Sequence, residues 1–258
     1  MHDATDFPRA PGFDLTGKHA LVVGASSGIG LAAAVALAEN GARVTLAARR
    51  ADRLRDIASR MQARGWHAGV LGLDISDVEA TQRAIGASGP FDILVNSAGT
   101  ALHSDATETR IADFDDVMTV NLRGAFFLTR AVAQGLIAAG QPGSLINISS
   151  QMGLVGGPER AVYCASKHAV EGFTKAMAID WGGRGIRVNT ICPTFILTDL
   201  TRPSFDDPKT RAWIMDQITL GRAGTPGDVV GAVLYLASDA SGLVTGSALR
   251  VDGGWTAA

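Results

Sequence analysis

The chain has 258 residues, of which 47% are hydrophobic, enough to bury one large core in a single domain. Its 23 basic and 25 acidic side chains give a formal net charge of −2 without a long run of either sign, so nothing indicates a nucleic-acid or membrane-surface partner. No apolar run approaches the roughly 18 residues that cross a bilayer. Two cysteines, and a start without a cationic and apolar leader, predict a soluble protein of the reducing cytoplasm.

Apolar, β-branched runs alternate along the chain with segments of helical periodicity. The runs predict seven strands, at 19–23, 43–47, 69–73, 92–95, 144–148, 186–191 and 248–251. The segments between them predict helices at 30–40, 52–64, 77–87, 111–139, 161–181 and 227–237. Strand followed by helix, repeated, predicts a Rossmann-type α/β fold, in which helices flank a doubly wound, seven-stranded parallel sheet.

The domain organisation follows from the same pattern. Residues 1–14 look like a tail, and a single domain is expected over 15–258. The least regular stretch, 193–224, follows the sixth predicted strand. In a sheet of this kind it lies beyond a strand's carboxyl end, where ligands bind, so it is expected to be the substrate-loop segment.

A glycine-rich turn joins the first predicted strand to the first helix. Glycine permits a tight turn and close approach of the backbone to a pyrophosphate, while the helix start offers free N–H groups. A glycine turn can also serve steric needs alone, but the strand-to-helix context favours a dinucleotide. The expected pyrophosphate-binding residues are Gly24, Ser26, Ser27, Gly28, Ile29 and Gly30.

The end of the second predicted strand indicates which cofactor is bound. An NAD-binding protein places a carboxylate there for the ribose 2′-hydroxyl, whereas this chain has Ala48 followed by Arg49 and Arg50. A guanidinium binds a phosphate bidentately, so Arg49 predicts NADP(H) as the preferred cofactor, with NAD(H) as the lesser one. The alternative is an ordinary solvated helix start, because Arg53 and Arg55 follow.

Four polar residues suit carbonyl reduction. Tyr163 and Lys167 lie one turn apart on one face of a predicted helix, Ser150 ends the fifth strand, and Asn121 lies in the preceding helix. Singly, each has an ordinary structural explanation as a cap, a satisfied polar group or a helix face. Together with the glycine turn they resemble the Asn-Ser-Tyr-Lys tetrad of the short-chain dehydrogenase/reductase family, in the family's order.

This resemblance covers about residues 15–255 and implies roles for further residues. Val23, Ser97 and Thr194 depart from the Thr, Asn and Gly that the family usually has. The segment Val251-Asp252-Gly253-Gly254 resembles one near a subunit interface, which implies a homotetramer. Besides the glycine turn and Arg49, the implied cofactor contacts are Asp74, Ile75, Asn96, Ala98, Gly99, Tyr163, Lys167, Pro193, Ile196 and Thr198.

The expected chemistry follows from the tetrad. Tyr163 is the general acid/base, and because a phenol with a pKa near 10 is a poor base, a neighbouring Lys167 ammonium would tune it. Ser150 would donate to the substrate oxygen, and by resemblance Asn121 would hold a water that relays protons to Lys167. Hydride chemistry here needs no metal, and the five histidines show no ligand spacing.

The expected substrate is a small carbonyl compound or alcohol such as a ketone, sugar or polyol. The expected pocket wall is largely apolar, so a neutral or moderately polar substrate is favoured. A 3-oxoacyl-acyl carrier protein reductase remains an alternative, although residues 135–143 lack the Lys and Arg that an acidic carrier would need. A non-catalytic dinucleotide sensor is another, although it has little need of a tetrad. The expected pocket residues are Gln151, Met152, Gly157, Leu197, Phe205 and Trp213.

Overall fold

The structure, a computed structural model, describes residues 11–257 and contains one seven-stranded sheet. All neighbouring strands run parallel, in the order β3-β2-β1-β4-β5-β6-β7. The predicted fold class is thereby confirmed. The strands are β1 His19–Val23, β2 Arg43–Ala48, β3 Ala68–Gly72, β4 Ile93–Asn96, β5 Gly143–Ile148, β6 Ile186–Pro193 and β7 Ala248–Val251.

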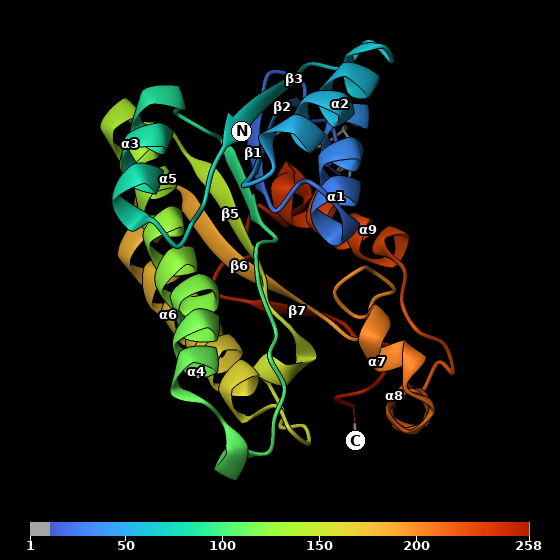
Figure 1. Cartoon of the computed structure of the whole chain (residues 1–258). Coiled ribbons are helices and arrows are strands. Elements are labelled where there is room, and N and C mark those ends of the chain that lie inside the picture. Colours follow the sequence, from blue (N-terminus) through green and yellow to red (C-terminus); the bar gives the residue numbers. More distant parts are fainter. Residues whose placement is uncertain (1–10, 258) are drawn as a thin grey trace, which may run out of the picture.

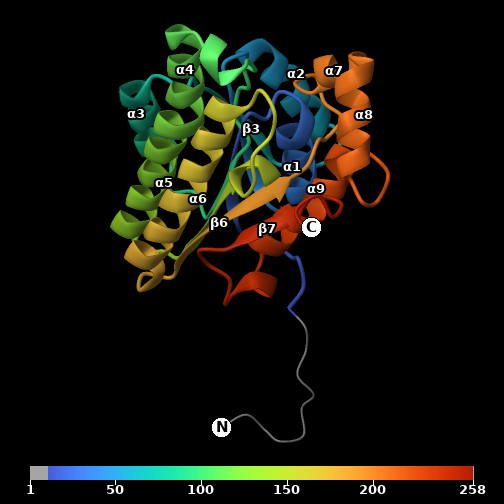
Figure 2. The same ribbon diagram turned by 90° about the horizontal axis from the view of Figure 1, so that it is seen from below.

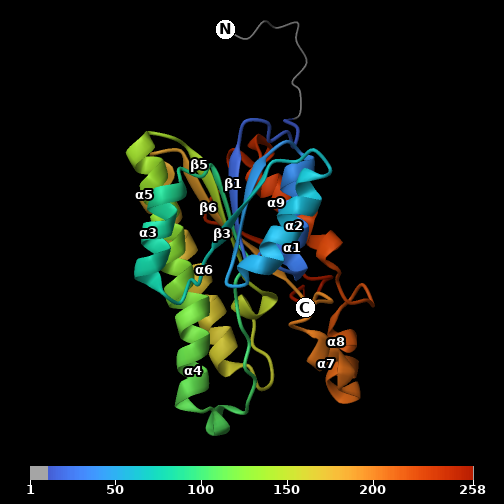
Figure 3. The same cartoon turned by 45° about the horizontal axis from the view of Figure 1, so that its top comes forward.

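Helices cover both faces of the sheet (Figure 1). One face carries α1 (Gly28–Glu39), α2 (Ala51–Gln62) and α9 (Pro226–Ala237), and the other carries α3 (Val78–Ser88), α5 (Ala125–Ala139) and α6 (Ala161–Gly182). Helix α4 (Ile111–Met118) and the pair α7 (Arg202–Asp206) and α8 (Pro208–Gln217) stand at the same end of the molecule, on opposite sides (Figure 3). None of the helices within 11–257 is long and apolar enough to cross a membrane.

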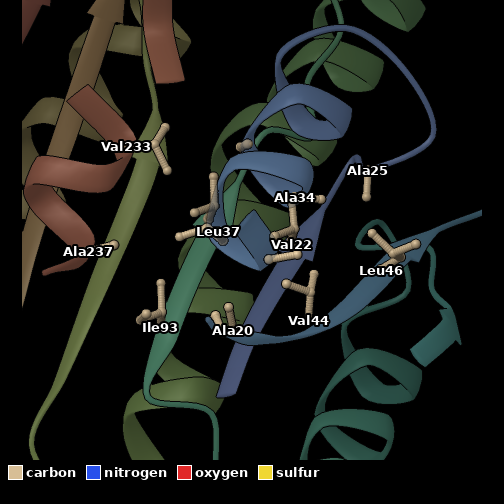
Figure 4. Close-up of a cluster of buried hydrophobic side chains, with 14 of the residues drawn as sticks. Ala20, Val22, Ala25, Ala34, Leu37, Val44, Leu46, Ile93, Val233 and Ala237 are labelled. Carbon is tan, nitrogen blue, oxygen red and sulfur yellow. The ribbon is translucent and has the colours of Figure 1, made fainter. Parts of the chain in front are cut away.

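Successive residues of the central strands supply two separate cores, because side chains alternate across a strand. In β1, Ala20 and Val22 pack toward α1 and α9, whereas Leu21 and Val23 pack toward α5. Figure 4 shows the first of these clusters, in which Val22 lies among side chains from α1 and β2. Because both faces of these strands are buried, their sequences are continuous apolar runs and do not alternate between apolar and polar residues.

The structure differs from the sequence-based elements at two places that matter for function. The helix predicted over 111–139 is interrupted by a π-helical turn, Thr119–Gly124, between α4 and α5. The stretch 193–224, expected to be irregular, contains α7 and α8. Of the predicted tail, residues 1–10 lie outside the described residues, and the first buried side chain after them is Leu15.

The chain reverses its direction of travel across the sheet between β1 and β4. From β1 it proceeds outward through β2 to β3, then returns to β4 and proceeds the other way to β7. The turns that leave β1 and β4 therefore diverge at the carboxyl ends of two adjacent strands, where ligands bind in open α/β sheets. In Figure 2, α4 lies on one side of the sheet and α7 and α8 lie on the other.

The α1 core can be tested by removing one buried side chain. Leu37 is fully buried between β1 and α9, so Leu37→Ala is expected to lower the free energy of unfolding by about 2–5 kcal/mol. Leu243→Ala is the matched control, because that leucine is fully exposed, and a change within about 0.5 kcal/mol is expected. Urea unfolding followed by tryptophan fluorescence measures both. Equal effects in the two variants would contradict this placement of the core.

Candidate active site

The glycine turn is shaped by contact with the turn that follows β4. A Cβ atom on Gly24 would lie 2.8 Å from the carbonyl carbon of Ser97, and one on Gly30 would collide with the carbonyl oxygen of Gly24. Gly24 and Gly28 also adopt left-handed backbone angles, with φ of +80° and +56°. A side chain on Gly24 would push the two turns apart, and one on Gly30 would push the start of α1 away from Gly24, so glycine is required at both positions.

The start of α1 is left free to bind an anion. Ser27, the N-cap residue, makes no side-chain capping hydrogen bond, and the first turn holds no acidic residue. The N–H groups of this turn and the positive end of the helix dipole therefore face outward without a competing carboxylate. This geometry fits the pyrophosphate of a dinucleotide.

The end of β2 presents a basic rim beside the turn. Arg49 and Arg50 are exposed, and the Arg50 Nη2 atom donates to Ser26 Oγ at 3.0 Å. Burial raises the pKa of Asp74, but hydrogen bonds from Ser76 and the charge of Arg49 outweigh it and hold that pKa below its ordinary value. Sequence reasoning singled out Arg49 but missed the link between Arg50 and the turn.

A hollow opens in front of the start of α1 and is rimmed by two more cations, Arg53 and Arg202. Thr198, expected at the cofactor, lies in it, and its methyl carbon would be 3.1 Å from a Cβ on Gly28. Leu197 and Phe205, expected in the substrate pocket, line this hollow instead. The complete lining is Ser27, Gly28, Leu31, Arg53, Leu197, Thr198, Asp199, Arg202 and Phe205.

The residues after β3 and β4 hold the neighbouring turns in place. Asn96 Nδ2 donates to Asn147 Oδ1 at 3.0 Å, and Asn96 Oδ1 accepts from the Ala98 N–H at 3.2 Å. The carbonyl of Ile75 lies 2.7 Å from where a Cβ on Gly124 would be, which fixes the π-helical turn against this loop. Pro193 ends β6, and the buried Ile196 pairs with Gly224 in an isolated bridge.

Tyr163 and Lys167 share one face of α6, as predicted from their spacing. Lys167 is buried, its Nζ atom donates to the Ile148 carbonyl at 2.9 Å, and it lies 5.7 Å from the centre of the Tyr163 ring. Burial lowers the pKa of Lys167 to about 8, against the opposing charges of Cys192 and Glu171. Burial also raises the pKa of Tyr163, although the Ser150 hydroxyl opposes this.

Ser150 and Asn121 are held by hydrogen bonds. Ser150 Oγ donates to Gln151 Oε1 at 3.0 Å and accepts from the Met152 N–H at 3.1 Å, so it caps a short 3₁₀ turn as well as facing the pocket. Asn121 lies in the π-helical turn, an irregularity often found at functional sites. Its Oδ1 and Nδ2 atoms bond both backbone groups of Thr100, each at 2.8 Å.

The tetrad residues converge from different elements. A Cβ on Gly99 would lie 3.3 Å from Asn121 Oδ1 and 3.8 Å from Lys167 Nζ, so the β4 turn, the π-helical turn and α6 meet at this point. Ser150 and Tyr163 line one pocket. The structure therefore brings together residues that lie up to 46 positions apart, from 121 to 167.

The pocket in front of Tyr163 is more polar than the sequence indicated. Gln151 and Met152 line it as expected, Gly157 lies behind it against Met152 and Arg160, and Trp213 packs on the far side of Arg160. Sequence reasoning missed Arg160, and it gave His103 no role beyond noting that the histidines lack the spacing of metal ligands. The complete lining is Ala101, His103, Ser150, Gln151, Met152, Arg160, Tyr163, Thr194, Phe195, Leu200, Thr201 and Ser204.

In the part of the chain that the structure describes, no three His, Cys, Asp or Glu side chains gather as a metal site would require. A doubly wound sheet with a glycine turn, a free helix start and a Ser-Tyr-Lys cluster at one edge defines an oxidoreductase of the dinucleotide-binding class. Comparison with known proteins identifies the family.

A family model described as enoyl-(acyl carrier protein) reductase matches residues 24–256. D-threitol dehydrogenase of Mycolicibacterium smegmatis is 41% identical over 249 residues, 95% of each chain. A short-chain type dehydrogenase/reductase of Mycobacterium marinum superposes with a TM-score of 0.90 at 36% identity, covering 95% of this chain and 98% of that one. A structure described as an NAD(P)-dependent gluconate 5-dehydrogenase of Beutenbergia cavernae, with bound NADP at low occupancy, superposes with a TM-score of 0.92 at 38% identity. The match covers 95% of this chain and 99% of that one. The chain belongs to the short-chain dehydrogenase/reductase family.

The buried charge of Lys167 predicts a pH dependence of stability. Below pH 8 the lysine is protonated in both the folded and the unfolded chain, so its burial is fully unfavourable. Between pH 8 and 10.5 the unfolded chain keeps a proton that the folded chain has lost, so raising the pH favours the folded state. Relative to a Lys167→Met variant, the free energy of unfolding of the wild type should rise by up to about 1.4 kcal/mol per pH unit between pH 8 and 10.5.

Urea unfolding of both proteins between pH 7 and 10 measures this difference. The variant is the control, because all other titrating groups are common to the two proteins. A difference that does not change with pH would mean that Lys167 keeps its ordinary pKa in the folded state.

Proposed function

We propose that the protein is an NADP(H)-dependent oxidoreductase that transfers a hydride between nicotinamide and a carbonyl or secondary alcohol of a small sugar-like or polyol-like substrate. The observation that carries this proposal is that Ser150 and Tyr163 line one pocket while the Lys167 ammonium lies behind the phenol. The similarity to D-threitol dehydrogenase and to a gluconate 5-dehydrogenase supports this class of substrate.

The chain's residues fit the cofactor. Gly24 and Gly30 leave no room for a Cβ atom, and the start of α1 offers free N–H groups. Arg49 and Arg50 follow β2, at the strand end where the adenosine ribose is recognised in this fold, so they suit a 2′-phosphate. We propose that Asp74 and Ile75 contact the adenosine half of the cofactor. The proposed contacts of the nicotinamide half are Asn96, Ala98, Gly99, Pro193, Ile196 and Thr198. The bound nicotinamide supplies or accepts the hydride.

Tyr163 supplies the proton in reduction. Its raised pKa keeps the phenol protonated at neutral pH, so a proton is available to the substrate oxygen as the carbonyl carbon gains a hydride. The phenolate that remains is stabilised by the Lys167 ammonium. The Ser150 hydroxyl, which donates to Gln151 Oε1 in this structure, turns to donate its one proton to the substrate oxygen instead. Asn121 Oδ1 has a second lone pair for a water beside Lys167, through which Tyr163 can be reprotonated.

The alternatives weighed from the sequence have less support. D-threitol dehydrogenase and the gluconate 5-dehydrogenase, which both match nearly the whole chain, are named for polyol and gluconate dehydrogenation and not for carrier-protein substrates, although the family model's description mentions a carrier protein. A dinucleotide sensor has no need of a Tyr163 that shares a pocket with Ser150.

We also propose a cytoplasmic homotetramer. Exposed apolar side chains on the outer helices support assembly, because Ile137 on α5 and Ile179 on α6 are 38% and 82% exposed in the single chain.

Arg49 tests the choice of cofactor. Arg49→Ala should weaken NADPH binding roughly ten- to a hundredfold while NADH binding changes little, because only NADPH carries a phosphate for this guanidinium. Arg60→Ala, an exposed arginine on α2, the helix that follows Arg49, is the control. Fluorescence titration with both cofactors measures the effect, and equal losses for NADPH and NADH would assign Arg49 to an ordinary helix start.

Tyr163 tests the mechanism. Tyr163→Phe removes the phenolic proton and keeps the ring, so turnover should fall by roughly a hundredfold or more while NADPH affinity stays within a few-fold. Turnover is followed by NADPH absorbance with a panel of ketones, sugars and polyols, and affinity by fluorescence titration. Unchanged turnover would remove Tyr163 from the chemistry, and wild-type protein that binds NADPH but turns over nothing would favour the sensor.

A further inference from the structure

Arg160 is a buried cation without an anionic partner. Only 6% of it is exposed, and no carboxylate among residues 11–257 lies within 4.0 Å of its nitrogen atoms. Its one side-chain hydrogen bond within that range runs from Nη1 to the Pro158 carbonyl at 2.7 Å. A guanidinium has five N–H donors, and a buried charge is unfavourable unless it is paired, so this residue is prepared for a ligand that brings negative charge.

The position of Arg160 is set by its surroundings. Its guanidinium carbon lies 5.4 Å from the ring centre of Phe195 and 5.2 Å from that of Trp213, which fixes the plane of the group. The preceding residue, Glu159, has a φ of +59°, the one left-handed angle of a non-glycine residue in the described chain. Such strain persists where the surroundings impose it, and it clusters at functional sites.

The same pocket contains a second unsatisfied group. The hydroxyl of Thr194 is buried, and among the described residues it has no hydrogen-bond partner. Arg160, Thr194, Ser150 and Tyr163 all line this one pocket. The guanidinium of Arg160, with a single side-chain hydrogen bond, and the unpartnered hydroxyl of Thr194 therefore belong to two side chains that line the space next to the atoms assigned to proton transfer.

The remaining titratable side chain on this wall brings no charge. Burial, and then the charge of Arg160, lower the pKa of His103 to about 4, so the imidazole is neutral near pH 7. It faces the edge of the Tyr163 ring at a centroid distance of 6.2 Å. Arg160 is thus the only charged side chain among the described residues that line the pocket.

We propose that Arg160 and Thr194 form a carboxylate-binding subsite, and that the substrate is a hydroxy or oxo acid of the sugar series rather than a neutral polyol. The fork of the guanidinium matches the two oxygens of a carboxylate, and the Thr194 hydroxyl donates to one of them. A phosphate, with more charge, would call for a second cation that this wall lacks. The inference rests on the proposed function and specifies the substrate class of the same site.

Matched substrate pairs provide the test. Each pair has the same carbon skeleton and differs only in a carboxylate or a hydroxymethyl group at carbon 1: D-threonate and D-threitol, D-gluconate and D-glucitol, D-galactonate and galactitol. Oxidation with NADP⁺ is followed by absorbance, and the measured quantity is the ratio of kcat/KM for the acid to kcat/KM for its neutral partner. The wild type should favour the acid by at least roughly tenfold in the pair that it oxidises best.

Three variants and one control separate recognition from folding. Arg160→Gln should lower the ratio roughly ten- to a hundredfold, and Arg160→Lys should recover part of it by restoring charge without the fork. Thr194→Val removes an unpaired buried hydroxyl, so it should raise KM for the acid severalfold without lowering the melting temperature. Arg211→Gln, an exposed arginine of α8, should leave the ratio unchanged.

The outcomes separate this inference from the function on which it rests. Preference for the neutral member of each pair, or equal losses on both members in Arg160→Gln, would overturn the carboxylate subsite and leave the oxidoreductase assignment intact. Should Arg160→Gln fail to fold, Thr194→Val still decides, because an unchanged KM for the acid counts against the subsite. Turnover of none of the six compounds by protein that binds NADPH would overturn the proposed function together with this subsite.

Discussion

The site depends on the close approach of two backbone turns at the point where the sheet connectivity divides. β1 and β4 are adjacent, and the turns leaving them run to opposite faces, yet the backbones of Gly24 and Ser97 come so near that no Cβ atom fits between them. This contact sets the start of α1 relative to the turn that carries Gly99. Because Gly99 lies against Asn121 and Lys167, the same contact also positions the start of α1 relative to these two residues. The part of the site that suits the pyrophosphate and the part that contains the tetrad are therefore positioned by one backbone contact.

The cations near the start of α1 and those near Tyr163 differ in their exposure to solvent. Near α1 the arginines are exposed and solvated, which suits an anionic cofactor that binds and leaves. Near Tyr163 the cations Lys167 and Arg160 are buried, and burial displaces their pKa values downward. Buried charges act over short distances with little screening, which suits proton transfer and the recognition of one particular substrate group.

Much of the fold could be predicted because its signals are local. Apolar runs marked all seven strands, and the glycine turn and the Tyr163–Lys167 spacing placed the site at one edge of the sheet. The π-helical turn escaped detection, since one extra residue hardly alters hydrophobic periodicity over 111–139. Arg160 escaped for a different reason: its burial depends on Phe195 and Trp213, which are distant in sequence. The family resemblance was confirmed, whereas the polar character of the pocket emerged only from the assembled structure.

The π-helical turn makes chain length, and not only residue identity, part of the site. Each residue of an α-helix advances by about 100° around the axis, and the turn at Thr119–Gly124 inserts one residue between α4 and α5. A chain shorter by one residue here could run as a continuous helix, but the faces of α4 and α5 would then be rotated against each other. Either α5 would no longer pack against the sheet, or the Asn121 side chain would point away from Lys167. The number of residues between α4 and α5 therefore constrains the site as strictly as the identity of Asn121 does.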